Sequence, residues 1–270
     1  MKWKNMLVKI GSKTSPQISW RDEFAQLELR RIGVESSLVR VDNPAEAILR
    51  GDADVAVLPL SELPLMRPGE LVVTAVSRRE HPGDVLVMRP EALDNRLDFG
   101  LAHGATVLTS TPWQAAQLRD FRPDLGIAVS VSGGTTLLDD LRQDNFAAIV
   151  TAAAELKGMD VSGLEVLELN PREFVPKPAQ GVLAWLAHRD DLPVRRLLKQ
   201  VHHPDVSACT NTERRVLQLL GGNAESLLGA FVERDAGGNF HAFLACVHAG
   251  GIRRTRLSQS TNFELAERLL

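Results

Sequence analysis

The chain has 270 residues, of which 44% are hydrophobic and 24% are charged, which is the balance of an ordinary globular protein. This composition excludes a disordered or fibrous protein. At about 150 residues per domain it predicts roughly two domains, with three small ones as the alternative. The formal net charge of −3 gives no sign of a nucleic-acid-binding protein. The chain has no tyrosine, so phenol groups are excluded as catalytic acids or bases.

No apolar run approaches the roughly 20 residues that a membrane-spanning helix needs. The N-terminal segment lacks the apolar core and small-residue cleavage site of a secretory signal, so we expect a cytoplasmic protein that has no membrane partner. Cys209 and Cys246 fit no metal or redox spacing, and we expect free thiols in a reducing compartment. The adjacent His202 and His203 point apart, so we expect no metal site there.

Short apolar runs and helical stripes alternate along the first part of the chain. We expect the first strand to end at Ile10, because Gly11, Ser12 and Lys13 break the apolar run. Strand–helix alternation of this kind predicts an open, largely parallel α/β sheet. The predicted strands are residues 6–10, 34–41, 54–58 and 71–76, and the predicted helices are residues 16–31 and 44–49.

The same alternation returns further along, which predicts a second α/β lobe with a cleft between the two. Its predicted strands are residues 106–108, 127–131 and 147–151, and its helices are residues 114–121 and 136–143. A third block begins near Pro204. It has a helix over residues 211–220 that stops at Gly221-Gly222, strands over 227–232 and 240–247, and a closing helix over 264–270.

Four loops follow predicted strands, and ligands of open α/β sheets bind beyond the carboxyl ends of the strands. In the first loop, Lys13 and Ser15 precede a helix and could bind an anion; the alternative is that Ser15 only caps the helix. In the second loop, Glu62 could act as a general acid or base, or it could be a solvated turn residue.

The third loop offers the hydroxyls of Thr109, Ser110 and Thr111, and we expect Thr109 or Ser110 to cap the helix that follows. Trp113 could stack on a flat ligand or pack in the interior. In the fourth loop, a glycine turn opens a helix whose backbone N–H groups could hold an anion. This loop contains Gly133, Gly134 and Thr135.

Six segments in order resemble motifs of the hydroxymethylbilane synthase (porphobilinogen deaminase) family: IGSKTSPQISW, GDADVAVLPLSELP, RREHPGDVLV, LTSTPWQAAQLRDFRPDL, NFAAIVTAAAELKGM and VPKPAQGVLA. The resemblance implies an α/β fold of two periplasmic-binding-protein-like (type II) lobes around a cleft, plus a small C-terminal α/β domain. We therefore expect lobe 1 over residues 1–87 with about 180–200, lobe 2 over 88–179, and the small domain over 204–270.

Members of this family condense porphobilinogen into a linear tetrapyrrole on a dipyrromethane cofactor linked to a cysteine. A cleft aspartate handles protons, and arginines bind the substrate carboxylates. At the matching positions the aspartate is replaced by Glu62, the opening arginine by Lys13, and the paired arginines of S-x-R-R by Trp113 and Gln114. The cofactor cysteine is replaced by Ala224. Arginine forms bidentate hydrogen bonds with carboxylates, which other side chains do not. These departures therefore weaken the case for the family's reaction.

The sequence therefore predicts a divergent member of the family without deaminase activity or dipyrromethane, which binds a small molecule in the interlobe cleft as a monomer. One alternative is an active synthase that uses a non-covalent primer and Glu62 as the catalytic carboxylate. Another is a different small-molecule enzyme on the same scaffold. The expected ligand-binding residues are Lys13, Ser15, Thr109, Ser110, Thr111, Trp113, Gly133, Gly134 and Thr135, with Glu62 as the candidate catalytic residue.

Overall fold

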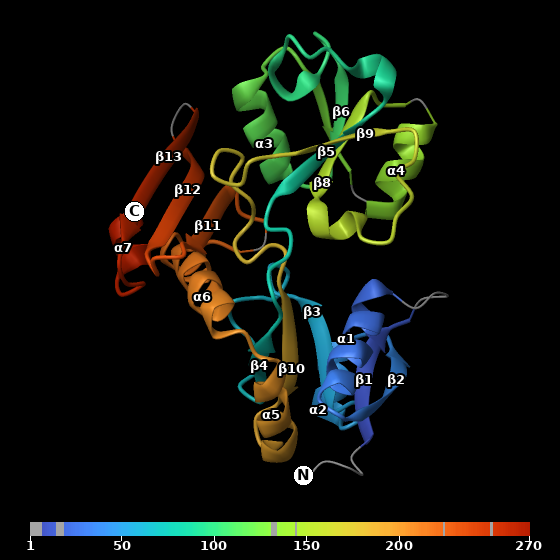
Figure 1. Cartoon of the computed structure of the whole chain (residues 1–270), viewed down its shortest axis with the longest axis vertical. Helices are drawn as coiled ribbons and strands as arrows, with labels where there is room; N and C mark the ends of the chain where they lie inside the picture. Colours follow the sequence, from blue (N-terminus) through green and yellow to red (C-terminus); the bar gives the residue numbers. More distant parts are fainter. Residues whose placement is uncertain (1–6, 15–18, 131–133, 144, 224, 249–250) are drawn as a thin grey trace. The chain divides into compact units, whose positions relative to one another are not determined.

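The computed structural model describes residues 7–14, 19–130, 134–143, 145–223, 225–248 and 251–270 (Figure 1). The chain forms two compact units. Unit 1 contains Met1–Arg79 and Val182–Ser207, and unit 2 contains Glu80–Gly181 and Ala208–Leu270. Among the described residues, no helix is long and apolar enough to cross a membrane.

Unit 1 is built on a five-stranded sheet in the order β2-β1-β3-β10-β4. Strands β1, β2 and β3 are parallel, whereas β10 lies antiparallel between β3 and β4. Side chains from the strands and helices, with the fully buried Trp185 among them, form its core. The elements are β1 (Leu7–Lys13), α1 (Trp20–Arg31), β2 (Glu35–Val41), α2 (Pro44–Arg50), β3 (Val55–Pro59), β4 (Leu71–Val76), β10 (Leu183–His188) and α5 (Leu192–Leu198).

The first strand does not end at Ile10 as predicted. It continues to Lys13, because β1 pairs in register with β2 along its whole length, from Leu7 opposite Glu35 to Lys13 opposite Val41. Cross-strand hydrogen bonds thus override the local turn preference of the Gly-Ser-Lys segment.

The first part of unit 2 has a second five-stranded sheet, in the order β7-β6-β8-β5-β9. Strands β6, β7 and β8 are parallel, and β5 runs antiparallel between β8 and β9. The elements are β5 (Asp84–Met88), β6 (Thr106–Thr109), α3 (Pro112–Phe121), β7 (Gly126–Val129), α4 (Gly134–Arg142), β8 (Ala148–Ala152) and β9 (Glu165–Glu168).

Both five-stranded sheets share one topology, in which a strand from a distant part of the chain is inserted antiparallel among parallel neighbours. This is the arrangement of type II periplasmic-binding-protein lobes, so the predicted fold class is confirmed. Neither inserted strand, β10 or β5, was predicted. Short 3-10 helices occupy Pro90–Ala92, Asp98–Gly100, Ala153–Leu156 and Lys199–Val201.

The C-terminal part of unit 2 is an antiparallel three-stranded sheet, β11-β12-β13. Its inner face packs on α6 and α7 around side chains such as Val216 and Leu265. Glu213 of α6 is fully buried, and its carboxylate accepts hydrogen bonds from the backbone N–H groups of Ala179 (2.6 Å) and Val232 (2.7 Å). The elements are α6 (Pro204–Leu219), β11 (Leu228–Arg234), β12 (Phe240–His248), β13 (Gly251–Gln259) and α7 (Leu265–Leu269).

One predicted boundary in this region differs from the structure: α6 begins at Pro204 rather than at residue 211. Cys209 is buried and Cys246 is partly buried, and neither of the two is in a disulfide.

Candidate functional site

In unit 1, two predicted site residues lie at the same edge of the sheet. Lys13 ends β1, and Glu62 lies in the loop that follows β3; both side chains are exposed. Because β1 and β3 are adjacent and parallel, their carboxyl ends meet at this edge. Ser15 lies outside the described residues.

Behind Lys13 the structure places a hydrogen-bonded group that the sequence did not predict. The hydroxyl of Ser12 donates to Asp22 Oδ2 (2.7 Å), and Nη1 of Arg40 donates to the same oxygen (3.1 Å) and to Ser12 Oγ (2.7 Å). Arg40 stands opposite Ser12 in the β1–β2 register. The arginine is therefore brought to the edge by strand pairing, which no local motif signals.

In unit 2, the loop after β6 holds the three predicted hydroxyl residues. Thr109 is fully buried, and its hydroxyl donates to the carbonyl oxygens of Thr111 and Ala128, both at 3.2 Å. Thr111, not Thr109 or Ser110, caps α3: its hydroxyl accepts from the backbone N–H of Gln114 (3.2 Å). The predicted capping residue is wrong because Pro112 is the first helical residue, which makes Thr111 the N-cap.

Ser110 opens a chain of side-chain hydrogen bonds that leads into the interior. Its hydroxyl donates to Gln114 Oε1 (2.7 Å), and Gln114 Nε2 donates to Asp84 Oδ1 (2.7 Å). Gln180 Nε2 donates to the same Asp84 oxygen (3.1 Å) and to the carbonyl of Gly83 (3.1 Å). This chain connects the loop after β6 with the first residue of β5.

Asp84 is a buried carboxyl group whose pKa is raised. It is 1% exposed, and Oδ2 has no hydrogen-bond partner among the described residues. Burial raises the pKa of Asp84 to about 6, although hydrogen bonds from Gln114 and Gln180 and the charge of Lys177 act in the opposite direction. Burial disfavours the ionised form because a carboxylate loses its hydration.

Trp113 packs in the interior of unit 2. Its side chain is 1% exposed, and its indole N–H donates to the carbonyl of Val175 (2.8 Å). Gln117 Nε2 donates to the same carbonyl (3.1 Å). Of the two roles considered for Trp113, packing is the one that the structure supports, because a buried indole offers no open face for stacking.

The carboxyl end of β7 lies at the same sheet edge as that of β6, because β6 and β7 are parallel neighbours. Gly134 and Thr135 begin α4, whereas Gly133 lies outside the described residues. The predicted residues thus fall into two groups: Lys13 and Glu62 belong to unit 1, and the hydroxyl and glycine loops belong to unit 2.

The adjacent histidines His202 and His203 have structural roles. Nδ1 of His202 accepts from the backbone N–H of Val76 (3.3 Å), and the pKa of His203 is lowered, chiefly by burial. The part of the chain that the structure describes contains no group of three or more side chains able to hold a metal ion.

Residues 17–196 match the family model described as porphobilinogen deaminase, dipyromethane cofactor binding domain. The chain belongs to the porphobilinogen deaminase family. It is 34% identical over 212 residues to the porphobilinogen deaminase of Chromobacterium violaceum, covering 78% of this chain and 66% of that protein. Over 208 residues it is 31% identical to the enzyme of Syntrophobacter fumaroxidans, covering 77% and 65%.

The match therefore spans just under two thirds of the length of these two relatives. A longer alignment, with 27% identity over 276 residues, covers 93% of this chain and 89% of the porphobilinogen deaminase of Xylella fastidiosa strain 9a5c.

Among solved structures, the chain is similar to the probable amino-acid ABC transporter extracellular-binding protein YtmK of Bacillus subtilis, with 10% identity and a TM-score of 0.49. That alignment covers 80% of this chain and 98% of YtmK. The periplasmic VFT2 domain of Bordetella pertussis BvgS gives 18% identity, a TM-score of 0.44, and coverage of 72% and 86%.

One retained family segment has a clear structural reason in this chain. Gln180 and Gly181 correspond to the family's Gln-Gly pair, and Gly181 has a φ of +76°. A Cβ atom there would overlap the carbonyl oxygen of His81. Only glycine therefore lets the chain pass so close while Gln180 reaches Asp84.

Proposed function

We propose that this member of the porphobilinogen deaminase family does not carry out the family's condensation. In this proposal it binds a smaller and less charged ligand at the loop edge of unit 2, where Ser110, Thr111 and the start of α4 lie. In unit 1, Lys13 and Glu62 at the carboxyl ends of β1 and β3 are a separate candidate contact.

One observation carries the proposal: the two side chains at the positions that resemble the family's paired arginines are buried and hydrogen-bonded within the protein. Trp113 is 1% exposed and bonded to Val175, and Gln114 is 2% exposed and bonded to Ser110 and Asp84. Neither side chain is directed to solvent or available for a carboxylate. Each arginine–carboxylate contact is worth about 1.5–3 kcal/mol as a charged hydrogen bond, so losing two of them weakens binding of a polycarboxylate by orders of magnitude.

The described thiols do not fit a covalently bound dipyrromethane. Cys209 and Cys246 both belong to the hydrophobic cluster between the C-terminal sheet and α6. A thioether to a bulky pyrrole pair would require this cluster to open, with loss of its packing energy. Ala224, at the family's cysteine position, lies outside the described residues. The proposal therefore includes a protein without the cofactor.

An intact mass of the purified protein, combined with an aldehyde-reagent assay for dipyrromethane and a porphobilinogen turnover assay, tests the first half of the proposal. We expect the mass of the bare chain, 29.6 kDa, with no colour and no turnover. A mass raised by that of a dipyrromethane, or formation of a linear tetrapyrrole, would overturn the proposal. Either result would favour the alternative hypothesis of an active synthase.

Thermal-shift and calorimetric titrations with acetate, glycine, succinate and porphobilinogen test the second half. We expect a monocarboxylate to bind more tightly than succinate or porphobilinogen. Ser110→Ala should then weaken its binding about tenfold, because one hydrogen bond to a charged group is lost. Ser260→Ala, an exposed serine of the same unit, is the matched control. Absence of binding by all four compounds would refute the ligand-binding half.

A further inference from the structure

The outer face of the C-terminal sheet carries three cross-strand rows that the proposed function does not use. Strand register aligns Glu233 with His241 and Ser258, Phe231 with Phe243 and Arg256, and Gly229 with Ala245 and Arg254. Because side chains alternate along a strand, all three rows lie on the face opposite the α6 cluster. The face therefore combines aromatic rings with a column of polar and basic side chains on β13.

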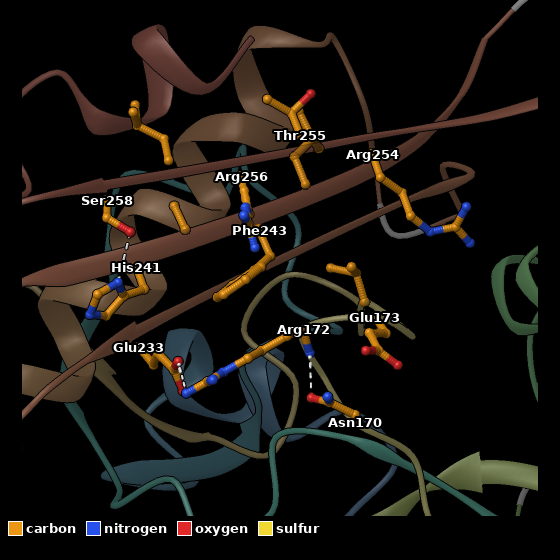
Figure 2. A pocket seen from close by; sticks show the side chains of 14 residues that line it. Asn170, Arg172, Glu173, Glu233, His241, Phe243, Arg254, Thr255, Arg256 and Ser258 are labelled. Atoms are coloured by element: carbon orange, nitrogen blue, oxygen red, sulfur yellow. Dashed lines mark hydrogen bonds and ion pairs between the residues drawn. The ribbon is translucent and has the colours of Figure 1, made fainter.

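A groove of about 910 Å³ lies over this face, between β12 and β13 on one side and the segment 170–175 on the other (Figure 2). This volume falls within the range of small-molecule sites. Arg172, Glu173, Phe243, Arg254, Arg256 and Ser258 are among the side chains that line it. A second cavity of about 340 Å³, lined by Phe99, Phe121 and Phe174, shares Asn170 and Glu173 with the groove.

Two of the three arginines in the groove are already paired. Arg172 is bonded to Glu233 (2.7 Å), and Arg254 is bonded to Asp120 (2.6 Å). Arg256 is exposed and forms no hydrogen bond or ion pair with any residue that the structure describes. It is thus the arginine of the groove whose guanidinium is available to a ligand.

The neighbour of Arg256 provides an apolar wall. Phe243 is half-buried and stands opposite Arg256 on the adjacent strand. Its ring stacks on Phe231 with centroids 6.1 Å apart and an interplanar angle of 22°, which fixes its orientation. The guanidinium of Arg172 lies 6.0 Å from the Phe243 centroid. A planar ring placed in the groove would therefore meet a rigid aromatic surface beside a free cation.

We propose that this groove is a second binding site, and that it takes a small aromatic monocarboxylate. Arg256 forms the bidentate pair with the carboxylate, and the ring of the ligand packs against Phe243, toward the cavity of Phe99 and Phe121. One free guanidinium matches one carboxylate. The exposed Glu173 on the groove wall repels ligands with several negative charges.

The test uses the full chain, 2-naphthoate as the ligand and its uncharged analogue 2-naphthylmethanol, with calorimetry for affinity and backbone amide NMR for location. We expect saturable 2-naphthoate binding that shifts amides of β12 and β13, and binding of the alcohol at least tenfold weaker. Arg256→Gln should weaken 2-naphthoate at least tenfold, because a charged bidentate contact is lost.

Arg253→Gln is the matched control, because Arg253 precedes Arg254 on β13, faces the other side of the sheet and carries the same charge. We expect it to change the affinity less than twofold. Three results would each overturn the proposal: no saturable binding of 2-naphthoate, equal weakening by both arginine variants, or equal affinity for the acid and the alcohol. Because Arg256 is exposed, its variant is expected to fold, and circular dichroism verifies this.

Discussion

Replacing Asp84 with asparagine should abolish a pH dependence of stability that the wild-type protein owes to one buried carboxyl group. Burial raises the pKa of Asp84 from its ordinary 3.8 to about 6, so the folded state binds a proton more tightly than the unfolded state. A raised carboxyl pKa favours folding at low pH, and this contribution is lost as the pH rises through the folded pKa.

The magnitude follows from the difference between the two pKa values. At about 1.4 kcal/mol per pKa unit, the change from 3.8 to about 6 amounts to about 3 kcal/mol of unfolding free energy. The loss sets in near pH 4, where the unfolded carboxyl is about half ionised and the folded one is still protonated, and it is nearly complete by about pH 7, where both are ionised. Asparagine resembles the protonated acid, since its Oδ1 can still accept from Gln114 and Gln180.

Urea denaturation at intervals from pH 4 to pH 8 measures the effect. We expect the Asp84→Asn variant to match the wild type near pH 4 and to exceed it by up to about 3 kcal/mol near pH 8. Asp139→Asn is the control, because Asp139 is exposed in the same unit and the substitution changes the charge equally. The reasoning is refuted if the difference between variant and wild type stays constant with pH, or if the control shows the same slope.

Three further predictions concern stability, each measured by urea denaturation at pH 7. Glu213→Leu removes the carboxylate that accepts from two buried backbone N–H groups, and we expect a loss of about 2–5 kcal/mol. Gly229→Ala places a Cβ atom against the carbonyl oxygen of Val175, and we expect a loss of at least about 2 kcal/mol from the forced backbone shift. Trp113→Phe loses the indole hydrogen bond to that carbonyl, and should cost about 1–2 kcal/mol more than Trp185→Phe, because Trp185 Nε1 has no partner in the described chain.

The first two of these have controls within unit 2. Gln218→Leu changes an exposed side chain on the same helix as Glu213 and should alter stability by less than about 0.5 kcal/mol. Gly251→Ala changes a glycine of β13 that has no atom near the added methyl group. If either control costs as much as its partner, then the named contact does not explain the loss. The tryptophan comparison fails if both phenylalanine variants lose the same stability.

Local signals predicted most of the helices and strands, because each such signal depends on only a few consecutive residues. The helix α2 is an example: Asn43 caps it, Pro44 opens it and Gly51, with a φ of 79°, ends it. Buried strands such as β3 and β8 are recognisable from short apolar runs. The alternation of strands and helices placed the loops at the carboxyl ends of these strands. The matching family model separately confirms the resemblance to the family.

The sequence did not predict the inserted strands β5 and β10 or the edge strand β13. Each depends on partners far along the chain: β10 pairs with β3 and β4, and β5 pairs with β8 and β9. A run of apolar residues indicates a buried strand, but it does not indicate which distant strand will pair with it. The hydrogen-bonded group around Arg40 was not predicted for the same reason. Arg40 reaches Asp22 only because β1 and β2 are paired.

For the candidate site, the sequence by itself determined which residue types occupy the loops, with Trp113 and Gln114 at the positions that resemble the family's paired arginines. Only the tertiary structure decided where those side chains point. Trp113 and Gln114 lie on the helix α3 that follows an expected loop, yet packing against Val175 and Asp84 turns both inward. The outer-face groove of β12 and β13 is likewise a product of packing: segment 170–175 covers Phe243 beside Arg256, and hydrophobic burial across distant segments leaves no local pattern in a sequence.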